Sequence, residues 1–130
     1  MMAWIDLVAV LAVIQLIVFG ILVGRARGKY GVVAPATTGH PIFERYYRVQ
    51  MNTIEVLVVF LPALWLAAKY WSPKYAALLG AVYLVGRLIY LRAYVGDPKT
   101  RTLGFSMSML PTLALVVAGL IGAVRALIAG

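Results

Sequence analysis

Four apolar stretches, each long enough to cross a lipid bilayer as a helix, constrain the fold of this chain more than any other feature. They lie at approximately residues 4–23, 42–70, 74–95 and 103–128. A spanning helix needs about 20 predominantly apolar residues. Within lipid every backbone N–H and C=O group must be paired inside the protein, which leaves helices or closed barrels. We therefore expect an all-α, integral membrane four-helix bundle that forms a single domain over residues 1–130.

Composition agrees with a membrane protein and disfavours several kinds of site. Hydrophobic residues make up 64% of the chain and charged residues 12%, compared with about 45–50% and about 25% in soluble domains. The chain has no cysteine and one histidine, His40, so we expect no disulfide, no metal site and no cysteine nucleophile. The net charge of +8 would suggest nucleic acid in a soluble protein. Here the basic residues flank apolar stretches, which favours a fixed topology and an anionic ligand, and no nucleic-acid partner.

The connections between the stretches differ in the number of basic residues that they carry. The first connection and its flanking helix ends carry five, the third carries three, the second carries two, and the N-terminus carries none. Cytoplasmic loops of membrane proteins are enriched in Lys and Arg. The distribution predicts a multi-pass protein with its first and third connections in the cytoplasm and both termini outside.

Two polar sets interrupt the apolar stretches. They are Arg48, Asn52 and Glu55 in the second stretch, and Arg87, Tyr90 and Tyr94 in the third. Spacings of three and four residues place the members of each set on one helix face. Because ionisable side chains at membrane depth are costly, they usually face a protein interior or a wet cavity and carry function. We expect the two sets to meet in one site near the cytoplasmic end of the bundle.

These segments resemble a known family, the membrane-associated proteins in eicosanoid and glutathione metabolism. The resemblance is carried by FERYYRVQMNTIE at residues 43–55 and VYLVGRLIYLRAY at residues 82–94, and the turn at residues 37–39 and the position of Arg101 also fit. It extends from about residue 25 to residue 101, and the outer helices match in hydropathy only. The resemblance implies a four-helix membrane bundle that assembles as a homotrimer, with glutathione bound between neighbouring subunits near the cytosolic face.

The resemblance also implies an activity and its residues. The chain would be a glutathione transferase that presents glutathione as a thiolate to lipophilic electrophiles, with reduction of lipid hydroperoxides as a further activity. Its partners would be glutathione as co-substrate, the lipophilic electrophile or hydroperoxide, membrane lipid, and further copies of the chain. Arg101 would stabilise the thiolate. The residues implied to contact glutathione are Arg27, Arg48, Gln50, Asn52, Glu55, Arg87, Tyr90 and Tyr94.

Physical chemistry agrees with this assignment. Glutathione carries two carboxylates and one ammonium group, and arginine forks bind carboxylates through paired, charge-assisted hydrogen bonds. Arg48 or Arg27 suits the carboxylates, and Glu55 suits the ammonium group. A thiolate is the nucleophilic form of a thiol, and a fixed cation such as Arg101 lowers the pKa of a nearby thiol.

Three positions depart from the pattern of the leukotriene-forming members of the family. Gly28 stands where those members have a second arginine, Val56 where they have a tyrosine, and Leu113 where they have a tryptophan. In the pattern implied by the resemblance, the arginine acts on the lipid substrate and the tryptophan caps its tail. We therefore expect a general glutathione-dependent enzyme and not a leukotriene enzyme.

Two other functions remain open. The family includes a non-catalytic lipid-binding member, so the fold alone does not establish activity. A small four-helix multidrug transporter matches in length and number of spans, but transporters of that kind usually carry a carboxylate near the middle of the first helix. Asp6 lies at the edge of that stretch, and Gln15 is uncharged.

A structural ion pair between Glu55 and Arg87 is an alternative to ligand binding by these two residues.

Overall fold

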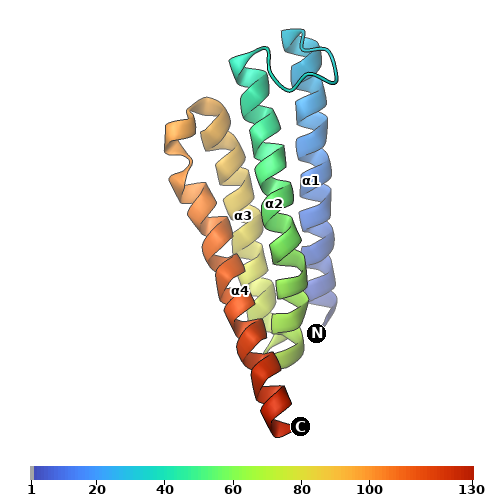
Figure 1. Ribbon diagram of the computed structural model, residues 1–130, viewed down its shortest axis with the longest axis vertical. Helices are drawn as coiled ribbons and strands as arrows, with labels where there is room; N and C mark the ends of the chain where they lie inside the picture. Colours follow the sequence, from blue (N-terminus) through green and yellow to red (C-terminus); the bar gives the residue numbers. More distant parts are fainter. Residues whose placement is uncertain (1) are drawn as a thin grey trace.

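The computed structural model describes residues 2–130, and this part of the chain forms four long α-helices (Figure 1). They are α1 (Met2–Tyr30), α2 (Pro41–Tyr70), α3 (Pro73–Gly96) and α4 (Thr102–Ala129). A single turn of 3-10 helix, η1 (Pro98–Thr100), lies between α3 and α4. All four α-helices are long and apolar enough to cross a membrane. The expected all-α membrane bundle is confirmed.

The helices lie side by side with α2 and α3 in the middle, α1 on one side and α4 on the other (Figure 1). Both chain ends and the α2–α3 turn lie at the lower end in Figure 1. The α1–α2 loop and the α3–α4 connection lie at the upper end. The two connections rich in basic residues therefore occupy the same end of the bundle.

The helix boundaries follow from local chemistry, with one difference from expectation. The Nδ1 atom of His40 accepts a hydrogen bond from the Ile42 N–H at 3.1 Å and caps α2, which begins at Pro41. Ser72 precedes α3 and Pro73 occupies its first turn, a position where the missing N–H costs nothing. Helix α1 continues beyond the apolar stretch to Tyr30, through Gly24 and Gly28, and it ends before Gly31, where the backbone turns to a φ of +69°.

Aromatic stacking and one polar contact join α1, α2 and α3 in the core. The rings of Phe60 and Tyr83 stack with centroids 3.9 Å apart, and both residues are buried. The Gln15 Nε2 group donates to the Leu84 carbonyl at 2.9 Å. This interhelical bond provides an acceptor for the Gln15 NH₂ group, which lipid tails could not provide.

Glycine residues allow α3 and α4 to approach closely. A Cβ atom at Gly86 would lie 2.7 Å from the Met107 carbonyl carbon, and one at Gly104 would overlap the Tyr90 backbone nitrogen. Both obstacles are backbone atoms, which cannot rotate away as a side chain can. Small residues at helix contacts are a usual means of packing in lipid, and here they bring the backbones of α3 and α4 together at Gly86 and Gly104.

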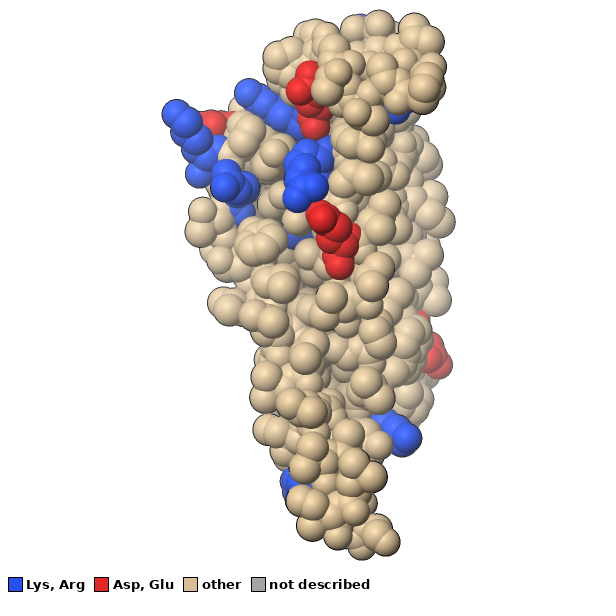
Figure 2. Space-filling view, in the orientation of Figure 1, with Lys and Arg blue, Asp and Glu red and all other residues tan. Residues whose placement is uncertain are grey.

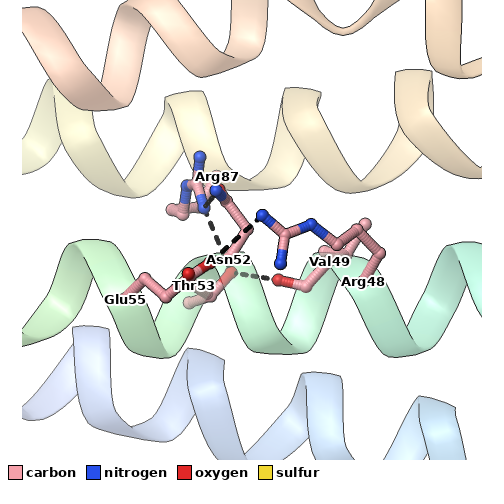
Figure 3. Close-up of polar contacts among 6 residues, drawn as sticks. All are labelled: Arg48, Val49, Asn52, Thr53, Glu55 and Arg87. Carbon is pink, nitrogen blue, oxygen red and sulfur yellow. Dashed lines mark hydrogen bonds and ion pairs between the residues drawn. The ribbon is translucent and has the colours of Figure 1, made fainter. Parts of the chain in front are cut away.

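A buried guanidinium group joins the three helices α2, α3 and α4, and Figure 3 shows its contacts with α2. The Arg87 Nη1 group donates to Asn52 Oδ1 at 2.7 Å and to Thr53 Oγ1 at 3.2 Å. The Nη2 group donates to Ser108 Oγ at 2.8 Å. The face of the Tyr90 ring lies 4.4 Å from the guanidinium carbon. Arg87 is fully buried, so these neutral acceptors and the ring replace the water that would solvate its charge.

Substitution of Gly86 by alanine is expected to lower the free energy of unfolding by about 1–3 kcal/mol, the usual cost of overpacking. The added methyl group would meet the backbone of α4 at Met107. Unfolding of the purified protein in a denaturing detergent measures the effect. Gly96→Ala is the matched control, because no atom lies within 4 Å of a Cβ atom there. Equal midpoints for the two variants would contradict the close packing of α3 on α4.

Substitution of Ser108 by alanine is expected to lower the free energy of unfolding by about 1.5–3 kcal/mol, the usual contribution of a hydrogen bond to a charged group. The variant leaves Arg87 Nη2 without the acceptor it has at 2.8 Å. Ser106→Ala is the control, because Ser106 lies on the same helix and makes no side-chain hydrogen bond within residues 2–130. We expect that control to stay within about 0.5 kcal/mol of the wild type. A Ser108 variant as stable as the control would contradict the role of this bond.

Candidate functional site

A polar pocket of about 610 Å³ opens where α2, α3 and the beginning of α4 meet. Basic side chains gather around this part of the surface, toward the upper end of the bundle (Figure 2). The pocket combines three kinds of group, namely guanidinium, amide or hydroxyl, and aromatic ring. Its lining residues are Arg48, Asn52, Tyr90, Tyr94, Arg101, Thr102 and Phe105.

Each helix supplies its pocket residues through helical spacing. Arg48 and Asn52 are one turn apart on α2, and Tyr90 and Tyr94 are one turn apart on α3 with ring centroids separated by 5.5 Å. Residues four positions apart share a helix face. The two polar faces predicted from the sequence therefore meet in one pocket in the structure.

The connection between α3 and α4 positions Arg101. Asp97 accepts a hydrogen bond from the Lys99 N–H at 3.1 Å and caps η1. The Arg101 Nη1 group then donates to the Pro98 carbonyl at 3.0 Å. A guanidinium group has five N–H donors, so this bond orients Arg101 and leaves its other donors available to a ligand.

The ion pair at the edge of the pocket joins Arg48 to Glu55 (Figure 3). The Arg48 Nη2 and Glu55 Oε1 atoms lie 3.2 Å apart, and the two side chains are 49% and 60% exposed. A pair this exposed contributes little to stability. The alternative of an ion pair between Glu55 and Arg87 is not what the structure contains, because Arg87 bonds to neutral acceptors. Glu55 thus remains accessible to a cationic group.

Arg87 lies beneath the pocket and not on its surface. It is fully buried and donates to Asn52 Oδ1, so the amide oxygen of Asn52 is committed to Arg87. The amide NH₂ group of Asn52, a side chain that lines the pocket, is then left as the donor that faces a ligand. Arg87 also supplies a positive charge that no carboxylate within residues 2–130 neutralises. The pocket is therefore electrostatically suited to an anion.

Two predicted contacts lie away from the pocket. The Arg27 Nη1 group donates to the Ala36 carbonyl at 2.6 Å, and its guanidinium carbon lies 4.8 Å from the Phe43 ring centre. Gln50 approaches α1, where its Nε2 atom would lie 3.0 Å from a Cβ atom at Gly20. Within one chain these two residues and the pocket form separate groups.

Sequence reasoning missed four residues of the site. Thr102 and Phe105 line the pocket, and Thr53 and Ser108 hold Arg87 from below. The position of Ser108 could have been found by counting along the hairpin. Arg87 precedes Asp97 by ten residues and Ser108 follows it by eleven, so two antiparallel helices bring them to the same level. Phe105 had no comparable signal, since an aromatic residue in an apolar span is usual.

Comparison with known proteins gives close relatives over most of the chain. A sequence model of the MAPEG family, the membrane-associated proteins in eicosanoid and glutathione metabolism, matches residues 5–121. An uncharacterised protein of Synechocystis is 49% identical over 118 residues, which cover 91% of this chain and 86% of that protein. Microsomal glutathione S-transferase 2 of Homo sapiens is 39% identical over 115 residues, which cover 88% of this chain and 78% of that enzyme.

A second kind of relative matches a shorter part of the chain. Leukotriene C4 synthase of Cavia porcellus is 42% identical over 102 residues, which cover 74% of this chain and 68% of that protein. The matched part of the family model contains every residue that lines the pocket and both residues of the Arg48–Glu55 pair. With this extent of similarity and a four-helix membrane architecture, the chain belongs to the MAPEG family.

Proposed function

We propose that this protein is a membrane glutathione transferase that binds glutathione in the pocket between α2, α3 and α4. The observation that carries the proposal is that Arg48 and Arg101 line one cavity and that Glu55 is paired with Arg48. Two named relatives, a glutathione S-transferase and leukotriene C4 synthase, support glutathione as the co-substrate. The pocket lies between helices that are long and apolar enough to cross a membrane, which supports access from the bilayer for lipophilic substrates.

The exposed ion pair suits the charged end of glutathione. The γ-glutamyl group carries an ammonium and a carboxylate on one carbon. It can therefore separate Arg48 from Glu55 and form an ion pair with each of them. In this arrangement Glu55 accepts from the ammonium group and Arg48 donates to the carboxylate. Little energy is lost when the pair opens, because both side chains are largely exposed and already hydrated. The Asn52 NH₂ group, fixed by Arg87, donates to a carbonyl of the tripeptide.

Arg101 and the buried charge of Arg87 act on the thiol. Loss of the S–H proton to water leaves a thiolate, and positive groups nearby favour that form. In the reaction the thiolate electron pair forms a new bond to an electrophilic carbon, and the displaced group leaves with the electrons of its own bond. Each unit by which the pKa of the thiol falls corresponds to about 1.36 kcal/mol of stabilisation of the anion.

We further propose that the site is completed in a homotrimer. Arg27 and Gln50 belong to the set implied to contact glutathione, yet they lie apart from the pocket of their own chain. A neighbouring copy could place them over the open side of the pocket. The upper end of the bundle carries the basic connections, so we assign the pocket to the cytoplasmic side, where glutathione is dissolved.

Substitution of Arg48 by alanine is expected to weaken glutathione binding roughly 10- to 100-fold, the usual effect of losing a charge-assisted hydrogen bond. Calorimetry of the detergent-purified protein measures the Kd. Because Arg48 is remote from the thiol in the proposed orientation, kcat at saturating glutathione is expected to change little. Arg92→Ala is the control, since Arg92 is exposed and does not line the pocket. An unchanged Kd in the Arg48 variant would contradict the proposed binding mode.

Substitution of Arg101 by alanine is expected to abolish most of the thiolate signal at neutral pH while leaving glutathione bound. The ultraviolet absorbance of the thiolate, followed as glutathione is added, measures this. The pKa of the bound thiol should return toward about 8.5, the ordinary value for a thiol. Turnover of the variant should therefore rise with pH across the range in which the wild type is already constant. Lys99→Ala is the control, and an undiminished thiolate signal in the Arg101 variant would contradict its role.

A further inference from the structure

A second cationic cavity lies between α1 and α2, separate from the polar pocket. It measures about 220 Å³. Arg25 and Lys29 are one helical turn apart, so their side chains stand on the same face of α1. Neither forms an ion pair within residues 2–130. The residues that line the cavity are Leu22, Arg25, Ala26, Lys29, Tyr30 and Tyr46.

The face of α1 that lines this cavity is not the face implied to bind glutathione. At 3.6 residues per turn, Leu22, Arg25 and Lys29 lie on the opposite side of the helix from Gly20 and Arg27. Gly20 is the residue that Gln50 approaches. The cavity therefore has no part in the proposed glutathione site, and its charges need another explanation.

The depth of the cavity matches the boundary between hydrocarbon and headgroups. Its inner wall is Leu22, which packs against the apolar cluster of Phe19, Val49 and Tyr90. The cations follow immediately, where the apolar stretch of α1 ends. Lys and Arg at such positions extend toward lipid headgroups, and tyrosine is enriched at the same level. A ligand in this cavity would therefore lie among the headgroups with its apolar part in the bilayer.

The outer wall of the cavity is held by aromatic contacts. The Lys29 Nζ atom lies 5.5 Å from the Tyr30 ring centre, and the Tyr30 ring stacks on His40 with centroids 4.0 Å apart. His40 also caps α2. The end of α1 is thereby tied to the start of α2, which keeps both cations beside Tyr46 and gives the cavity a defined shape.

From this arrangement we propose that the cavity binds the phosphate group of an anionic membrane phospholipid. An arginine fork, a lysine ammonium group and tyrosine hydroxyls are donors that suit phosphate oxygens. Liquid water occupies about 30 Å³ per molecule, so 220 Å³ accepts a larger group such as phosphate. The cavity lining contains no acid, and Glu44 on α2 accepts instead from the Gly39 N–H at 3.1 Å. The lining thus carries two cations and no carboxylate to pair with the cation of a choline headgroup, which favours an anionic lipid.

Competition between two lipids tests the proposal. The full chain is equilibrated in micelles that contain equal amounts of phosphatidylglycerol and phosphatidylcholine, and native mass spectrometry measures which lipid it retains. The test variant is Arg25→Gln with Lys29→Gln. The control is Arg92→Gln with Lys99→Gln, which removes the same charge from exposed residues at the same end of the bundle. The unfolding midpoint of each variant confirms that it is folded.

We expect the wild type and the control to retain phosphatidylglycerol in preference to phosphatidylcholine. The preference of the test variant should fall roughly 10- to 30-fold, as expected for two cations at a membrane surface. An unchanged preference in the test variant, or an equal fall in the control, would overturn the proposal. Inorganic phosphate, added at constant ionic strength, should not displace the lipid. Displacement by free phosphate would assign the cavity to a soluble anion and overturn the lipid as its occupant.

Discussion

The buried guanidinium group of Arg87 is the interaction on which the upper half of this bundle depends. It is fully buried at membrane depth, and it is held by one acceptor from α4, two from α2, and the ring of Tyr90 on its own helix. A charge in this position is tolerated when most of its donors are paired; both Nη groups of Arg87 are paired, whereas its Nε atom has no hydrogen-bond partner within residues 2–130. The three helices must therefore keep one relative position, which is also the position that forms the pocket. Stability and site geometry rest on the same contacts.

The charge balance of the pocket follows from that arrangement. Arg87 is paired with neutral groups, so its positive charge is not cancelled, whereas the charge of Arg48 is balanced by Glu55. The positive charge of Arg87 thus lies below the pocket, the neutral pair of Arg48 and Glu55 lies at one edge, and Arg101 lies at another edge. Such a distribution suits a ligand that is zwitterionic at one end and becomes anionic at the other. Glutathione as a thiolate has both properties, which is why binding and activation are assigned to different arginines.

Much of the fold was predictable from the sequence because hydropathy and helical spacing are local properties. Four apolar stretches specify four helices, and residues 48, 52 and 55 share a face whatever surrounds them. The Gln15 side chain donates from α1 to α3, as a polar residue in an apolar span usually does. The partners of Arg87 were not predictable in this way, because they depend on the axial register of α4 against α3. That register is set by glycines at 86 and 104, where backbones touch. Sequence reasoning accordingly identified the charged residues of the site but not the hydroxyl groups that hold them.

We propose that one pocket of this bundle binds glutathione with its thiol beside Arg101. A crystal structure of the lipid-embedded protein with glutathione is the decisive measurement. We expect the γ-glutamyl group between Arg48 and Glu55, the sulfur atom next to Arg101, and Arg27 and Gln50 of a neighbouring copy against the tripeptide. Glutathione bound elsewhere, or an empty pocket at saturating glutathione, would contradict this binding mode.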